Sequence, residues 1–100
     1  MELNIHSVHF NSDKKLISLI NEKCLKMQNF NDTITSVDVY LKLENGHDHI
    51  HDKTVEIKTN ILKSQIFTKS TSKTFEKAFS DAMLATVSKL KKKKEILKSS

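Results

Sequence analysis

The stretch that decides the fold is Val37-Asp38-Val39-Tyr40-Leu41-Lys42-Leu43-Glu44, in which apolar residues stand at every second position. Because successive side chains of a β-strand point to opposite faces, this period of two predicts a strand with one buried face. A polar connection over 44–53 follows, and alternation then resumes from Val55 to Ile61. We therefore expect a second half-buried strand there, with a third, short strand at 64–70.

Alternation also marks the beginning of the chain. Glu2–His6 alternates polar and apolar residues, and Val8 continues on the opposite parity. This pattern predicts a strand over 2–9 with a bulge near Ser7.

Two segments have the three- and four-residue spacing of amphipathic helices. The first is predicted over 13–28 with Ser12 as its N-cap, on the stripe Leu16, Ile20, Cys24 and Met27. The second is predicted to follow a cap at Thr71 or Ser72, on the stripe Phe75, Ala78, Phe79, Ala82, Met83, Val87 and Leu90. The element order is then β-α-β-β-β-α. We expect an α+β fold in which a four-stranded sheet packs both helices on one face and leaves the other face open.

Composition narrows the class of function. The 100 residues, 37% of them apolar and 29% charged, fit one soluble domain, which we place at 1–98 with a terminal tail at 99–100. No stretch has the length of a membrane span or the pattern of a secretory leader, so we expect a cytoplasmic protein without a membrane partner. Gly46 is the one glycine, which excludes glycine-rich phosphate loops and dinucleotide fingerprints.

The net charge of +5 is concentrated at one end of the chain. Residues 1–88 contain 11 Lys and 11 acidic residues, whereas Lys89–Lys98 contains six Lys and one Glu. Such polarity favours a polyanion as partner, although a lysine-rich end can also merely solubilise a helix. Because all 17 basic residues are lysine, we expect recognition of phosphate position rather than of base sequence.

No catalytic or metal centre is predicted. Cys24 lies on an apolar helical stripe, so we interpret it as a buried packing residue and not as a nucleophile. If extended, His47, His49 and His51 would point the same way and could hold zinc, but we favour an exposed polar loop. The carboxylates are scattered among lysines, so we expect no enzyme, no cofactor and no small-molecule substrate.

Three segments, in this order, resemble the ribosome hibernation promoting factor family, also known as ribosome-associated inhibitor A. The segments are Val8-His9-Phe10 with Glu22-Lys23-Cys24-Leu25-Lys26-Met27, then Val37–Glu44 with Lys53–Lys58, and finally Ser72–Ala78 running into Lys89–Lys94. The resemblance implies a fold similar to double-stranded RNA-binding domains. It also implies a short form or N-terminal domain of the family, without the dimerisation domain of long members.

The family resemblance further implies a translation inhibitor that acts under stress. Such a protein binds the small ribosomal subunit and its rRNA in the channel for messenger and transfer RNA, and promotes ribosome hibernation; we expect a monomer off the ribosome. By matching positions, the RNA contacts would be Lys23, Lys26, Lys89, Lys91, Lys92 and Lys94.

Two alternatives stay open at this level. The chain could be a protein-interaction module that uses the open sheet face, where Tyr40, Lys42 and Lys58 form either an RNA patch or ordinary cross-strand pairs. It could also be a metal binder through the histidine loop.

Overall fold

The computed structural model describes residues 1–8, 11–45 and 51–99, with side chains at all of these except 45, 51 and 94–99. The elements are β1 (Glu2–Val8), α1 (Lys14–Leu25), the 3-10 helix η1 (Lys26–Asn29), β2 (Ile34–Asn45), β3 (His51–Ile61), β4 (Ser64–Ser72) and α2 (Phe75–Ser99). The predicted α+β class and β-α-β-β-β-α order are confirmed.

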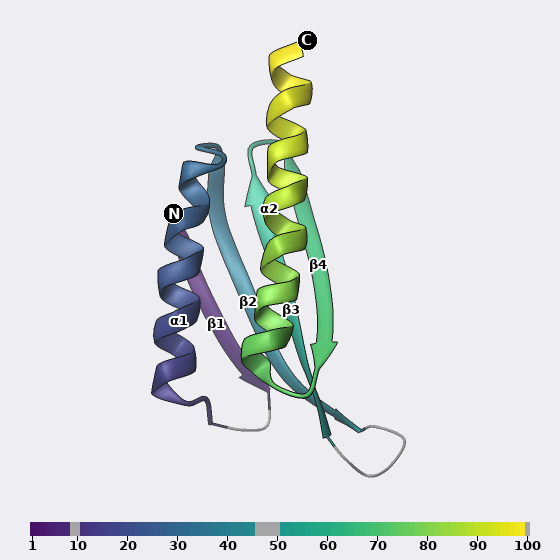
Figure 1. Cartoon of the computed structure of the whole chain (residues 1–100). Helices are drawn as coiled ribbons and strands as arrows, with labels where there is room; N and C mark the ends of the chain where they lie inside the picture. Colours follow the sequence, from purple (N-terminus) through teal and green to yellow (C-terminus); the bar gives the residue numbers. More distant parts are fainter. Residues whose placement is uncertain (9–10, 46–50, 100) are drawn as a thin grey trace.

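The strands form one sheet in the order β1-β2-β3-β4, with β1 parallel to β2 and the other pairs antiparallel. Both helices cover the same face of this sheet, as predicted (Figure 1). On that face the register places Val39 between Ile5 and Ile57. The arrangement therefore has two layers, with the core between helices and sheet.

The bulge predicted near Ser7 is wrong. Strand β1 pairs with β2 without a shift, and Val8 stands opposite Lys42. Val8 thus continues the regular alternation and lies, half-buried, on the open face. Because Val8 is apolar but lies on the open face, the apolar residues of this segment switch from odd to even positions, and the sequence pattern resembled that of a bulge.

The hairpin between β2 and β3 is longer than the sequence indicated. Glu44 pairs with Asp52 and Leu43 with Lys53, so much of the expected connection over 44–53 is strand. The hydrogen bonds between paired strands are made by the backbone. The pairing of β2 with β3 therefore continues past the core into residues with polar side chains.

The cap of α1 is Asp13 and not Ser12. The Asp13 carboxylate accepts a hydrogen bond of 3.0 Å from the N–H of Lys15, whereas the Ser12 hydroxyl contacts Ser7 Oγ. Asp and Ser are comparably good N-cap residues, so residue type alone does not tell which of two neighbouring residues caps the helix. The helix also ends earlier than predicted, at Leu25, where the chain tightens into η1.

The cap of α2 is Thr74 and not Thr71 or Ser72. Thr74 Oγ1 accepts from the N–H of Lys77 at 3.1 Å. Thr71 and Ser72 instead extend β4 along β3. Because Thr71 and Ser72 pair with β3, the helix cap lies two or three residues later than predicted, at Thr74.

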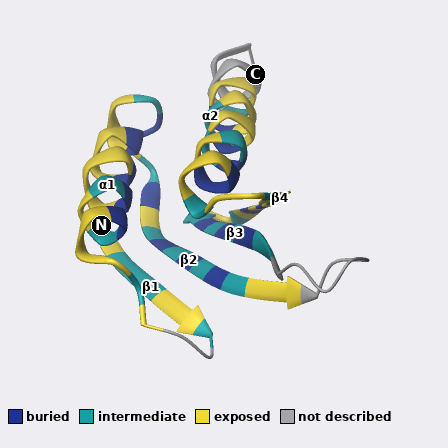
Figure 2. Ribbon diagram, turned by 60° about the horizontal axis from the view of Figure 1, so that its bottom comes forward, coloured by how far each residue is buried: buried dark blue, intermediate teal, exposed yellow. Residues whose placement is uncertain are grey.

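The apolar stripes of both helices pack on the sheet, and Figure 2 shows their buried faces turned inward. Cys24 and Met27 are fully buried, and Ala78, Phe79, Ala82 and Leu90 form the corresponding part of α2. The predicted burial of Cys24 is confirmed. Within the described residues, no helix is long and apolar enough to cross a membrane.

Candidate functional site

The lysines near the end of α2 point to different sides of the helix. Lys91 Nζ lies 5.0 Å from the centroid of the Phe30 ring, on the side of α1. Lys89 Nζ donates a 3.2 Å hydrogen bond to the carbonyl oxygen of Phe67, on the side of β4. Since consecutive helical residues are ~100° apart, a run of lysines cannot share one face.

A shallow groove of about 290 Å³, which we call the edge groove, runs between α2 and β4. Lys89 and Lys92 line it together with Lys93, whose ammonium group contacts Ser64 Oγ. Lys93 was not among the predicted RNA contacts, although its place in the lysine run was a signal for it. Lys89 and Lys93 thus bring charged side chains from α2 onto the edge strand β4, and covering an edge in this way discourages its pairing with another chain.

The predicted residues of the first helix lie in different environments. Lys23 is exposed and lines a second groove, between α1 and α2. Lys26 lies in η1, and its Nζ is 3.5 Å from the Glu22 carboxylate. Both members of this pair are more than half exposed, so the pairing stabilises little and leaves Lys26 within reach of a stronger anion.

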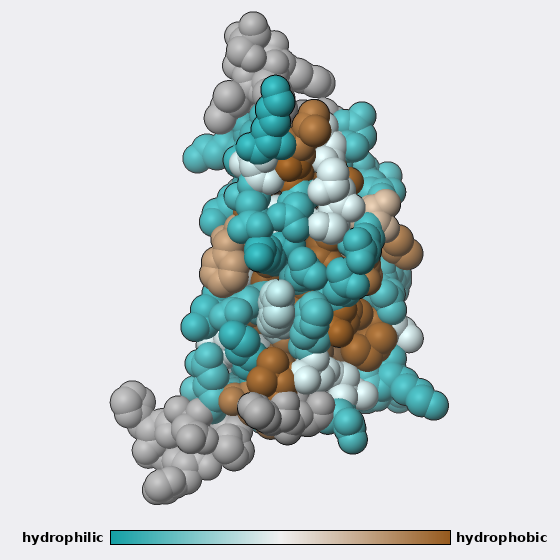
Figure 3. All heavy atoms as spheres, turned by 180° about the vertical axis from the view of Figure 1, so that it is seen from behind, coloured by the Kyte–Doolittle hydropathy of each residue, from teal (hydrophilic) through white to brown (hydrophobic). Residues whose placement is uncertain are grey.

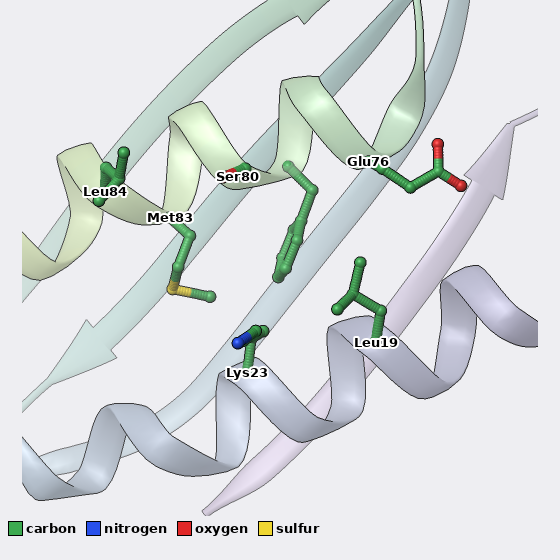
Figure 4. Close-up of a pocket in the computed structure, with 7 residues that line it drawn as sticks. Leu19, Lys23, Glu76, Ser80, Met83 and Leu84 are labelled. Atoms are coloured by element: carbon green, nitrogen blue, oxygen red, sulfur yellow. The ribbon is translucent and has the colours of Figure 1, made fainter.

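The groove between the helices, the interhelical groove, has a volume of about 270 Å³. Leu19 and Lys23 project from α1 toward α2, and Met83 projects back toward α1 (Figure 4). The remaining lining residues are Glu76, Phe79, Ser80 and Leu84. The groove thus has mainly apolar walls, with one cation, Lys23, and one anion, Glu76, among its lining residues.

The structure thus places four of the six predicted lysines on two sides of α2. Lys23 lines the groove between α1 and α2 and Lys91 reaches Phe30, just after η1, whereas Lys89 and Lys92 flank β4. Lys94 is part of α2, and its side chain lies outside the described residues. All of them belong to the helical layer, so a polyanion that approaches this layer meets cations on either side of α2.

The open face of the sheet carries paired charges. The Lys42 ammonium is 2.9 Å from the Glu56 carboxylate and 6.0 Å from the Tyr40 ring centroid, and His6 stacks on Tyr40 at 4.6 Å. Figure 3 shows this face as largely hydrophilic with separate apolar patches. The cross-strand pair of Lys42 with Glu56 favours the interpretation of Tyr40, Lys42 and Lys58 as surface pairs over an RNA patch.

The other candidate sites are weaker. His47 and His49 lie outside the described residues, as does the side chain of His51. Elsewhere, in the parts of the chain that the structure describes, no three His, Cys, Asp or Glu residues are grouped to hold a metal ion. Burial raises the pKa of the Cys24 thiol to about 12, which keeps it protonated and unreactive near neutral pH.

Comparisons with known proteins agree with this architecture. A sequence model of the family described as sigma-54 modulation protein / S30EA ribosomal protein matches residues 3–98. The fold is similar to a ribosomal subunit interface protein from Coxiella burnetii, with a TM-score of 0.83 and 18% identity over 95% of this chain and 99% of that one. It is also similar to the Protein Y N-terminal domain of Thermus thermophilus, with a TM-score of 0.78 and 12% identity over 92% and 98%. A search of curated proteins finds no match.

Proposed function

We propose a function for this chain on the premise that it belongs to the sigma-54 modulation / S30EA ribosomal protein family, as the match over residues 3–98 shows. This membership confirms the resemblance to the ribosome hibernation promoting factors. The chain is a ribosome-associated protein of that family. The finer proposal is that it binds the small ribosomal subunit in the channel for messenger and transfer RNA and holds the ribosome in hibernation.

The observation that carries the proposal is the placement of lysines on the helical layer. Lys23 lines the groove between the helices and Lys91 reaches Phe30 on the side of α1, and Lys89 and Lys92 flank the other side of α2. A helix that displays cations on several sides suits insertion into a cleft lined by phosphates, because each lysine acts as a point charge. We propose Lys23, Lys26, Lys89, Lys91, Lys92 and Lys94 as the contacts to rRNA.

Inhibition of this kind requires occupancy and no chemistry. A domain spanning 1–98, bound as a monomer in the channel, excludes messenger and transfer RNA by its volume. The buried, protonated Cys24 and the paired charges of the open face fit this non-enzymatic role. The site of action is the cytoplasm, where idle ribosomes are held.

Sedimentation with purified ribosomes tests the proposal. The chain should pellet with the small subunit, and added transfer RNA should displace it because both occupy one channel. If transfer RNA does not reduce pelleting, the binding site lies outside the channel. If the chain does not pellet with ribosomes, the proposed function is wrong.

A second candidate is a protein-interaction module that uses the open face. It is favoured by Phe67, whose side chain is 50% exposed on the edge strand β4. Phe67→Ser should leave ribosome binding intact under the first proposal. Under the second, it should abolish the capture of a protein partner.

A further inference from the structure

We propose that the interhelical groove receives one unstacked nucleobase of ribosomal RNA. This inference deepens the proposed function and rests on it. It starts from a mismatch between the groove and its surroundings: the helical layer presents cations to solvent, yet the groove in its middle is walled by Leu19, Phe79 and Met83. Leu84, which also lines it, is 69% exposed.

The size of the groove selects a small occupant. At about 270 Å³ it lies just below the roughly 300–1,000 Å³ range of drug-sized ligand pockets. An amphipathic helix would need a longer groove with anchors over several turns. A single planar ring fits, and single-stranded RNA presents such rings one at a time.

The lining of the groove selects the base over the rest of a nucleotide. Phosphate and ribose would lose hydration against Leu19 and Met83, whereas the face of a base is apolar enough to gain contact there. Figure 4 shows Leu19 and Met83 projecting from opposite helices, so a ring in the groove would have an apolar side chain from each helix beside it.

Cations near the groove bind the RNA backbone on either side of the inserted base. Lys23 makes no ion pair within the described residues and lies at the groove, where it can bind a phosphate beside the inserted base. Lys91, held over Phe30, places a second cation on the α1 side of α2. Two cations and an apolar slot complement a backbone that turns one base inward.

Polar groups at the groove narrow the choice of base. The Glu76 carboxylate accepts hydrogen bonds and donates none when ionised, and Ser80 adds a hydroxyl. An acceptor favours bases with an exocyclic amino group, which are adenine, cytosine and guanine, over uracil.

Filling the groove tests the proposal. Ser80→Phe places a ring in the groove without changing the charge. Ser88→Phe is the matched control, because Ser88 is also exposed on α2 but lines neither groove. Two readouts are used with purified ribosomes: affinity at several salt concentrations, and dimethyl sulfate reactivity of the rRNA bases at saturating protein.

We expect Ser80→Phe to lose about tenfold in affinity, the scale of one stacked base, with an unchanged salt slope. At least one adenine, cytosine or guanine should be protected from dimethyl sulfate by wild type and by Ser88→Phe but react freely with Ser80→Phe. Equal affinities and equal footprints for all three chains would overturn the inference, as would equal losses in both variants. Failure of the proposed function itself is distinguishable, because wild type would then not bind at all.

Discussion

Thr68 and Thr86 join β4 to α2 through a hydrogen bond of 2.7 Å between their hydroxyl oxygens, in the buried core. Thr86 Oγ1 also donates to the carbonyl oxygen of Ala82 at 2.9 Å. Because one hydroxyl has one proton to donate, Thr68 must be the donor to Thr86. This pair attaches the long helix to the edge strand beside the edge groove.

We predict that Thr86→Val destabilises the fold by about 1–3 kcal/mol, because it leaves the buried Thr68 hydroxyl without an acceptor. Urea unfolding of both proteins measures the difference. Adding Thr68→Val should recover part of the loss, since removal of both partners leaves no unsatisfied group. The coupling would be contradicted if the double variant lost as much unfolding free energy as the two single variants together, or more.

Neutralising Lys89, Lys91, Lys92 and Lys94 to Gln should weaken ribosome binding and leave the fold intact. Each phosphate contact contributes roughly −0.7 to −0.9 to the slope of log affinity against log salt, so the slope should flatten by about three units. Lysine-to-arginine changes at these positions should be tolerated, because charge carries the contact.

The matched control for this series neutralises four exposed lysines elsewhere, Lys14, Lys15, Lys69 and Lys73. It makes the same change in net charge and should leave the slope nearly unchanged. Equal slopes for wild type and both variants would mean that the run at the end of α2 only solubilises the helix.

Cys24→Ser should cost about 1–2 kcal/mol of stability, through a hydroxyl placed in the core, while ribosome binding at low temperature survives. Iodoacetamide should modify native Cys24 slowly at pH 8, because the thiol is fully buried. Fast alkylation that abolishes binding would contradict the packing role.

Burial also predicts a dependence on pH, because it raises the pKa of the Cys24 thiol from 9.0 to about 12. Between these values the unfolded chain has lost a proton that the folded chain keeps, so stability falls as pH rises above 9. The fall is about 1.4 kcal/mol per pH unit. From pH 8 to pH 10.5, wild type should therefore lose about 2 kcal/mol more than Cys24→Ala. Equal losses would show a thiol that titrates in the native state.

Removing metal should change nothing. We predict that EDTA leaves the melting temperature unchanged, and that protein treated with EDTA and then freed of chelator still binds ribosomes in magnesium buffer, because we expect His47, His49 and His51 to form an exposed polar loop and not a structural metal site. A melting temperature that falls with chelator and recovers with zinc would favour the metal-binding alternative.

The sequence by itself determined the elements and their faces. Alternation around Val39 and Ile57 predicted which side of the sheet is buried, and the stripe through Ile20 and Cys24 predicted the inner face of α1. Such patterns are local: the period of the backbone decides which side chains share a face, and apolar burial follows. The concentration of lysine at the end of α2 was visible for the same reason.

Only the tertiary structure decided where those lysines lie relative to other elements. Lys91 reaches Phe30 and Lys89 reaches the Phe67 carbonyl, contacts between residues far apart in the chain. The cap at Thr74 likewise depended on how far β4 continues along β3. The interhelical groove exists because two stripes on one sheet face hold the helices side by side, with Leu19 and Met83 between them. Helical periodicity fixes the direction of a side chain about its own axis, but the distance between two helices is set by the sheet on which both pack.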